Sequence, residues 1–162
     1  MLWELLAMAT APEPAWWLDA FVTRARALEG EAQLAPRRPG LAFRGPVWGL
    51  VDTEVRRALE EQLTVLDACD RGYSGAFLLE TVPSALYILA RHAREPEAAI
   101  LSAVNDTKDN DTIAAIVGAA VGALHGRNAL PTRWVKGLLG RTSESDDGRV
   151  FELIAQARKR WG

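Results

Sequence analysis

The feature that most constrains this chain is a run from Ile113 to Gly126 in which nearly every side chain is small and apolar. It reads Ile-Ala-Ala-Ile-Val-Gly-Ala-Ala-Val-Gly-Ala-Leu-His-Gly, and alanine is the residue that favours helix most strongly. Residues four apart share one side of a helix, so Gly118, Gly122 and Gly126 form a stripe that another backbone can approach closely. The run is shorter than the ~18 residues that a membrane span needs. It therefore predicts a helix that is wholly buried at the centre of a globular fold.

Two carboxylates and a hydroxyl stand directly before this helix, in Asp109-Asn-Asp111-Thr112. Side chains two residues apart point to the same side of an extended backbone, so Asp109 and Asp111 can face one point. With Thr112 they offer hard oxygen ligands, which suit Mg²⁺, Mn²⁺ or Ca²⁺ rather than zinc or copper. The alternative interpretation is that the carboxylates only cap the helix and face solvent. An EF-hand is excluded, because Ile113 and Ala114 stand where its loop needs Asp and Gly.

A family resemblance rests on this segment and on two others. Residues 104–126 closely resemble the C-terminal signature of the ADP-ribosylglycohydrolases, which is an Asp-x-Asp-Thr ahead of an Ala/Gly-rich helix ending in glycine. The resemblance extends back through residues 72–89, Gly-Tyr-Ser-Gly-Ala-Phe-Leu-Leu-Glu-Thr-Val-Pro-Ser-Ala-Leu-Tyr-Ile-Leu, and forward to Leu-Pro-Thr-Arg-Trp at 130–134. Asp-x-Asp-Thr alone would be a weak signal, but its combination with the flanking segments is specific.

The resemblance implies a hydrolase that removes ADP-ribose from a modified protein side chain or from a small ADP-ribosyl ligand. It implies two divalent metal ions, and Asp109, Asp111 and Thr112 would furnish the C-terminal half of the site that holds them. Mg²⁺ is the expected ion, although Mn²⁺ accepts the same oxygen ligands.

The same resemblance assigns a substrate-binding role to the turn that precedes the Glu-Thr-Val-Pro segment. In the family this turn lines the cleft beside the adenosine part of the ligand. The corresponding residues of this chain are Tyr73, Ser74, Gly75, Ala76 and Phe77. The alternative is a plain turn at the start of a helix, with Tyr73 and Phe77 packed inward.

Some of the family's motifs have no counterpart in this sequence. A catalytic glutamate and a Thr-Asp-Asp metal motif precede the signature in the family, and nothing in residues 1–70 matches them. Ser145-Asp-Asp147 lies downstream of the signature and is expected to cap the last helix. We therefore expect no catalytic residue in this chain, which would be one domain, 1–162, forming the C-terminal half of a larger enzyme. Such a chain would be inactive alone, and would pair with the missing half or self-associate. The alternative function is a non-catalytic helical module that binds a partner or ADP-ribosyl ligand.

Composition narrows the class of protein further. The 162 residues are 49% hydrophobic and 25% charged, which is typical of a globular domain. A formal net charge of −2, without a basic stripe, gives no electrostatic footprint for nucleic acid. The N-terminus lacks the basic segment and long apolar core of a signal peptide. The single cysteine, Cys69, fits a reducing compartment, so we expect a cytoplasmic protein without a membrane span.

Helical spacing of apolar residues extends over most of the chain and predicts an all-α fold, a compact orthogonal helical bundle. The predicted helices are 2–9, 15–28, 52–68, 79–93, 95–104, 113–126, 131–140 and 147–160. Trp17, Phe21 and Leu28 would form the apolar face of the second helix. Glycines and prolines mark residues 31–49 as a loop, in which Arg37-Arg38 is expected to be solvated.

Overall fold

Every regular element of the protein is helical, apart from an isolated bridge between Leu34 and Gly45, in a computed structural model that describes residues 1–37 and 41–161. The elements are α1 (Leu2–Leu5), α2 (Pro14–Glu29), α3 (Val47–Leu50), a π-helical segment η1 (Val51–Val55), α4 (Arg56–Glu60), α5 (Val65–Gly72), α6 (Leu78–His92), α7 (Pro96–Asn105), α8 (Asn110–His125), a 3-10 turn η2 (Arg127–Ala129), α9 (Thr132–Gly137) and α10 (Arg149–Trp161). The prediction of an all-α fold is confirmed. The chain divides into two compact units, Met1–Ala129 and Leu130–Gly162, which are described separately. Within the described ranges, no helix combines the length and apolar character that crossing a membrane requires.

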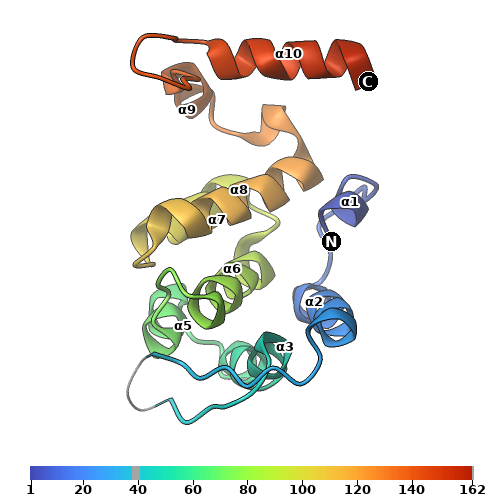
Figure 1. Ribbon diagram of the computed structural model, residues 1–162, viewed down its shortest axis with the longest axis vertical. Helices are drawn as coiled ribbons and strands as arrows, with labels where there is room; N and C mark the ends of the chain where they lie inside the picture. The colour runs from blue at the N-terminus through green and yellow to red at the C-terminus, as the bar shows by residue number, and fades with distance from the viewer. Residues whose placement is uncertain (38–40, 162) are drawn as a thin grey trace. The chain divides into compact units, whose positions relative to one another are not determined.

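Helix α6 is the central element of the first unit. It contacts α2, α3, α5, α7 and α8, and its residues from Leu79 to Ala90 are almost all buried (Figure 1). Large apolar side chains such as Leu86 and Ile88 explain this position, because each removes much apolar area from water when buried.

Helix α8 is only half buried, so the prediction of a wholly buried helix at 113–126 was wrong. It packs through one face, which consists of Ile113, Val117, Ala120 and Val121. On the glycine stripe, nothing else described comes within 4 Å of where a Cβ at Gly118 or Gly122 would stand. Small side chains gain little from burial, so a helix built of alanine and glycine can also lie at a surface.

The predicted helix at 52–68 is in fact two helical stretches separated by a break. The chain is helical from Val47, passes through the π-helical η1, and leaves α4 after Glu60. Gln62 has a positive φ of 54°, and Thr64 then begins α5 by accepting a hydrogen bond from the backbone N–H of Asp67. The predicted start at residue 52 was therefore wrong, because the chain is already helical from Val47.

A buried tyrosine of α6 stabilises this break. The hydroxyl of Tyr87 donates to the carbonyl of Leu63 over 2.7 Å and lies 3.3 Å from the carbonyl of Ala58. The Ala58 carbonyl also accepts from the backbone N–H of Leu63 over 3.2 Å, so it already has a partner. The tyrosine therefore supplies a hydrogen-bond donor to the Leu63 carbonyl, in the break between α4 and α5.

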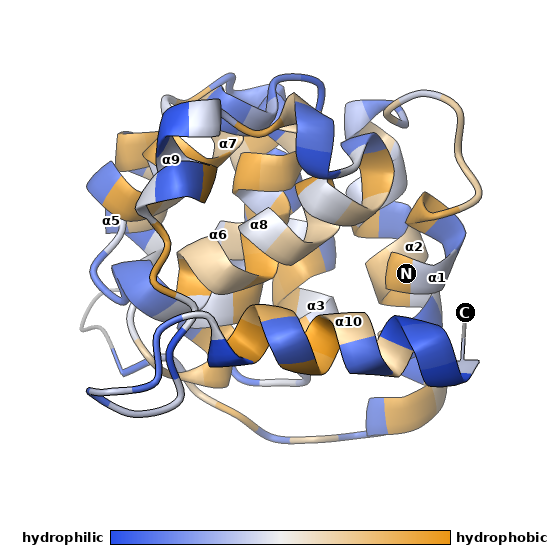
Figure 2. Ribbon diagram, turned by 90° about the horizontal axis from the view of Figure 1, so that it is seen from above, coloured by the Kyte–Doolittle hydropathy of each residue, from blue (hydrophilic) through white to orange (hydrophobic). Residues whose placement is uncertain are grey.

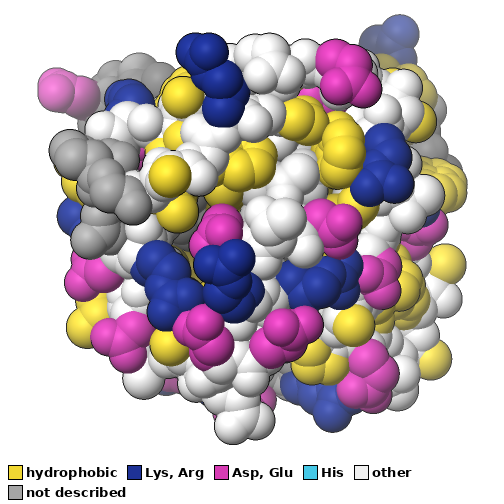
Figure 3. Space-filling model, turned by 90° about the horizontal axis from the view of Figure 1, so that it is seen from below, with side chains coloured by type: hydrophobic (Ala, Val, Ile, Leu, Met, Phe, Trp, Pro, Cys, Tyr) yellow, Lys and Arg dark blue, Asp and Glu magenta, His cyan; other side chains and the backbone are white. Residues whose placement is uncertain are grey.

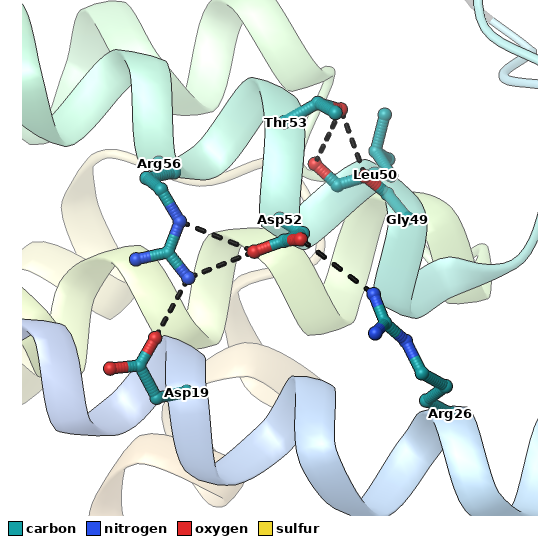
Figure 4. A network of polar contacts seen from close by, with 7 residues as sticks. All are labelled: Asp19, Arg26, Gly49, Leu50, Asp52, Thr53 and Arg56. Carbon is teal, nitrogen blue, oxygen red and sulfur yellow. Dashed lines mark hydrogen bonds and ion pairs between the residues drawn. The ribbon is translucent and has the colours of Figure 1, made fainter.

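Charged side chains connect α2 to the η1 segment (Figure 4). Arg56 donates to Asp19 over 2.8 Å and to Asp52 over 2.9 Å, and Arg26 lies 3.9 Å from Asp52. The hydrogen bonds with Asp19 and then Asp52 raise the pKa of Arg56 above its usual value. Figure 3 shows one face of the molecule on which basic and acidic side chains lie beside one another. Ion pairs this exposed contribute modestly to stability.

The loop between α2 and α3 folds back on itself as far as it is described. Leu34 and Gly45 exchange two backbone hydrogen bonds of 3.0 and 2.9 Å, and the Glu29 carboxylate accepts from the N–H of Val47 at the start of α3. The loop prediction was correct except that α3 begins at Val47, and residues 38–40 lie outside the described part. Leu28, predicted on the apolar face of α2, is 88% exposed, whereas Trp17 is buried.

The second unit contains α9, α10 and the loop between them. Apolar and polar residues are interspersed in the first part of α10, and its last turn is basic, with Arg158, Lys159 and Arg160 (Figure 2). The segment Ser145-Asp-Asp147 was expected to cap α10, but the Asp146 side chain accepts hydrogen bonds from other residues. The hydroxyl of Thr142 and the backbone N–H of Ser143 donate to Asp146 instead, and they lower its pKa to about 2. Gly140 lies beyond the end of α9 with a φ of 64°, and it faces the ring of Phe151.

Candidate functional site

The turn between α5 and α6 has an unusual backbone that buries one of its polar residues. Tyr73 ends α5 in the left-handed conformation with a φ of 73°, and Ser74 also has a positive φ of 26°. Ser74 is 1% exposed. The hydroxyl of Thr81 in α6 donates to the carbonyl of Gly75 over 2.8 Å, which satisfies a buried main-chain acceptor of the turn.

This turn is joined by hydrogen bonds to the segment that carries the two carboxylates. The carbonyl of Ser74 accepts from the backbone N–H of Asp109 over 2.9 Å and from that of Lys108 over 3.2 Å. The Ser74 hydroxyl also accepts from the N–H of Lys108 over 3.2 Å. The fold therefore brings together the two sets of residues that the sequence singled out, the turn at 73–77 and the group at 109–112.

Asp109, Asp111 and Thr112 lie together at the start of α8, though not on the extended backbone we expected. Asp109 is the N-cap residue, and Asp111 already belongs to the first turn of the helix. The Thr112 hydroxyl donates to Asp109 Oδ1 over 3.2 Å, and the Thr112 backbone N–H donates to Asp111 Oδ1 over 2.8 Å. The bond from the Thr112 backbone, and then the adjacent Asp109 carboxyl, lower the pKa of Asp111.

One oxygen atom of the Asp109 carboxylate has no hydrogen-bond partner in the part of the chain that the structure describes. No side-chain hydrogen bond from Asp109 caps α8, and its Oδ2 is buried without a hydrogen-bond partner among the described residues. A buried carboxylate oxygen is costly unless it is paired or coordinates a cation. This donor set fits a divalent cation that takes oxygen ligands. Across the described ranges, however, no group of three or more His, Cys, Asp or Glu side chains is placed to hold a metal. Further ligands would have to come from water, substrate or other residues.

The two aromatic residues of the turn have different environments. Tyr73 is 41% exposed, and the ammonium of Lys108 lies 4.9 Å from the centre of its ring. Lys108 also pairs with Asp70 over 2.8 Å. Phe77 is half-buried and packs against the core. The turn therefore presents one aromatic ring to solvent and one to the interior, with exposed Ala76 between them.

A charged pair beside the turn was not predicted. Glu80, in the first turn of α6, is 1% exposed, and Arg37 donates to its two carboxylate oxygens over 3.0 and 2.5 Å. The hydrogen bond to Glu80 raises the pKa of Arg37. Arg37 is exposed, as expected for a solvated loop, but its pairing with Glu80 was not expected. Arg38 lies outside the described residues. One feature of the sequence could have revealed this pair: Glu80 is a single carboxylate in a helix whose other buried side chains carry no charge.

Gly75 is required by this pair. A Cβ at position 75 would lie 2.6 Å from Glu80 Oε2 and 3.3 Å from the ring of Tyr73. Contacts this short are not tolerated without movement of the Glu80 carboxylate. The glycine therefore allows the carboxylate to lie against the turn.

The all-helical fold, and the hydrogen bonds that join a glycine-containing turn to the carboxylate pair at a helix start, agree with the family that the sequence resembles. Comparison with known families identifies it: the model of the ADP-ribosylglycohydrolase family matches residues 2–160, and the chain belongs to that family. The match confirms the resemblance inferred from residues 70 to 140 and extends it over nearly the whole chain. No curated protein and no solved structure matches the chain.

Proposed function

We propose that this chain contributes to metal-dependent hydrolysis of an ADP-ribosyl substrate, either an ADP-ribosylated protein side chain or a small ADP-ribosyl ligand. The observation that carries the proposal is the hydrogen bond from the Asp109 N–H to the Ser74 carbonyl. It places the candidate metal ligands beside the turn that resembles the family's adenosine-binding segment. Membership of the ADP-ribosylglycohydrolase family supports the reaction class.

In this proposal Asp109, Asp111 and Thr112 hold the metal. Asp109 Oδ2 is the best candidate ligand atom, because it is buried and has no protein partner among the described residues. Asp111 is exposed and stays ionised at neutral pH, since its pKa is lowered. Divalent cations, with Mg²⁺ expected and Mn²⁺ possible on the same ligands, would supply Lewis-acid binding of the ribose hydroxyls and of a water molecule.

The turn at 73–77 would hold the adenosine part of the ligand. The exposed ring of Tyr73 offers a face on which adenine can stack. The buried Ser74 sets the position of the turn by its bonds to Lys108 and Asp109. The proposed catalytic glutamate and Thr-Asp-Asp motif are not among the residues of this sequence, so we propose that turnover requires them from additional sequence.

The test is an ADP-ribose release assay on an ADP-ribosylated protein, with and without Mg²⁺. It would use the chain alone and the chain mixed with a family segment carrying the Thr-Asp-Asp and glutamate motifs. We expect activity only in the mixture, only with metal, and none with Asp109→Asn. Metal-independent release, or release unaffected by Asp109→Asn and Asp111→Asn, would disprove the metal role.

The second candidate is a binding module that recognises ADP-ribosyl groups without cleaving them. The observation that favours it is that no cluster of three acidic, histidine or cysteine ligands occurs in the described residues. ADP-ribose binding measured by calorimetry, without release under any condition, would support it. Sedimentation would test whether the chain self-associates or pairs with the added segment. A cytoplasmic location is part of the proposal, resting on the single cysteine.

A further inference from the structure

Arg37 contacts a different part of the turn from the segment that carries the candidate metal ligands. That segment meets the turn at Ser74, which is hydrogen-bonded to Lys108 and Asp109. The Arg37 guanidinium pairs with Glu80 and lies 5.2 Å from the ring centre of Phe77, at the start of α6. The carboxylate segment and the guanidinium therefore both border the turn at 73–77.

The guanidinium is held in a fixed orientation and still has donors to offer. Glu80 accepts from Nε and Nη2, while Nη1 takes no part in the pair. A guanidinium carries five N–H groups, so Glu80 takes two of them and three have no partner among residues 1–37 and 41–161. The Arg37 side chain is 55% exposed although Glu80 is 1% exposed, so a ligand oxygen can reach these donors. Because the carboxylate and the ring already restrain the side chain, little conformational entropy is lost when it binds.

We propose that Arg37 binds the diphosphate of an ADP-ribosyl ligand, with Glu80 as the residue that positions it. This assignment rests on the proposed function, which supplies the ligand. The planar guanidinium fork matches phosphate oxygens better than an ammonium does. The metal site would take the uncharged ribose hydroxyls, and Arg37 would take the anionic part between ribose and adenosine.

Lys108 is the rival for this role. Its ammonium lies over the Tyr73 ring and pairs with Asp70 over 2.8 Å. It is a point charge on a flexible stem, whereas Arg37 is oriented by a buried carboxylate. The two residues can be separated experimentally, because each pairs with a different carboxylate, Arg37 with Glu80 and Lys108 with Asp70.

The test compares the binding of ADP-ribose and adenosine, which lacks phosphate, to the purified chain by calorimetry. Arg37→Met should weaken ADP-ribose binding about tenfold, the loss typical of one charge-assisted hydrogen bond, and change adenosine binding less than about twofold. Arg37→Lys should lose part of the ADP-ribose affinity. Arg94→Met is the matched control, because Arg94 forms an exposed ion pair with Glu13 elsewhere in the unit, and it should change neither.

A double variant keeps the test valid if Arg37→Met destabilises the fold by leaving Glu80 without this partner. The double variant Arg37→Met with Glu80→Gln removes both charges. It should show the same loss of ADP-ribose affinity, without a matching loss of adenosine affinity. Equal losses for both ligands would show that Arg37 only supports the turn, and would overturn the assignment. So would unchanged binding, or a selective loss in Lys108→Met instead. A wild-type chain that binds neither ligand would overturn the proposed function, and the Arg37 assignment with it.

Discussion

The backbone N–H of Asp109 donates to the carbonyl of Ser74 over 2.9 Å, so the residue that begins α8 is fixed to the turn that precedes α6. Main-chain hydrogen bonds of this kind do not depend on side-chain rotamers. The relative position of the carboxylates and the turn is therefore set by the backbone, and substitutions of the Asp109 side chain can test its chemistry without dismantling the site.

Asp109→Asn and Asp111→Asn should each remove an anionic ligand, and so weaken Mg²⁺ binding and abolish metal-dependent ADP-ribose release. Stability should change by less than about 1 kcal/mol, because Asp111 is exposed and Asp109 Oδ2 makes no bond that would be lost. Titration calorimetry and thermal melting measure the two effects. The control is Asp67→Asn, a carboxylate in the first turn of α5, which should leave Mg²⁺ binding unchanged. Full metal binding in both variants would contradict the assignment.

Gly75 and Gly122 should respond in opposite ways to alanine. Gly75→Ala should destabilise by ~1–3 kcal/mol, because the new Cβ would meet Glu80 Oε2 at 2.6 Å. Gly122→Ala should stabilise by roughly 0.5–1 kcal/mol, since the position is helical and nothing described lies within 4 Å of the added carbon. Thermal melting of the two variants measures both changes in stability. A large loss at Gly122 would reveal a close neighbour on the glycine stripe.

Tyr87→Phe should destabilise by ~1–3 kcal/mol. The substitution keeps the ring but removes the hydroxyl that donates to Leu63 over 2.7 Å, which leaves a main-chain acceptor unpaired. Denaturant unfolding gives the loss, and hydrogen exchange should show faster opening around residues 58–63. A variant as stable as wild type would mean that water replaces the hydroxyl.

Cys69 should not react with thiol reagents in the folded protein at pH 8. Burial raises the pKa of its thiol from 9.0 to about 11, so little reactive thiolate forms. Because the folded pKa is raised, the stabilising contribution is complete below pH 9 and is lost as the pH rises towards 11. Cys69→Ala should remove this part of the alkaline loss, which is seen by comparing unfolding free energies at pH 8 and about 10.5. Rapid labelling at pH 8 without unfolding would contradict the buried position.

Local chemistry made much of this protein predictable. The all-helical class follows from apolar spacing, and the helix predicted at 95–104 forms as α7, Pro96–Asn105. The candidate ligands Asp109 and Asp111 were found because short-range sequence order decides which side chains stand at a helix start. Such features depend on neighbours along the chain, which the sequence displays directly.

Only the tertiary structure decided which helix is buried, where the helix predicted at 52–68 breaks, and which charge pairs with Glu80. An apolar run of small residues can lie equally well in a core or at a surface. In this protein α6 is the buried central helix, and α8 packs through only one face. At the break after α4, the Leu63 carbonyl accepts from the Tyr87 hydroxyl, which comes from α6. Arg37 and Ser74 gained their roles through contacts between segments far apart in the chain, and no local spacing encodes such contacts. The physical reason is that helix formation is a local balance, whereas burial and pairing depend on which surfaces the folded chain brings together.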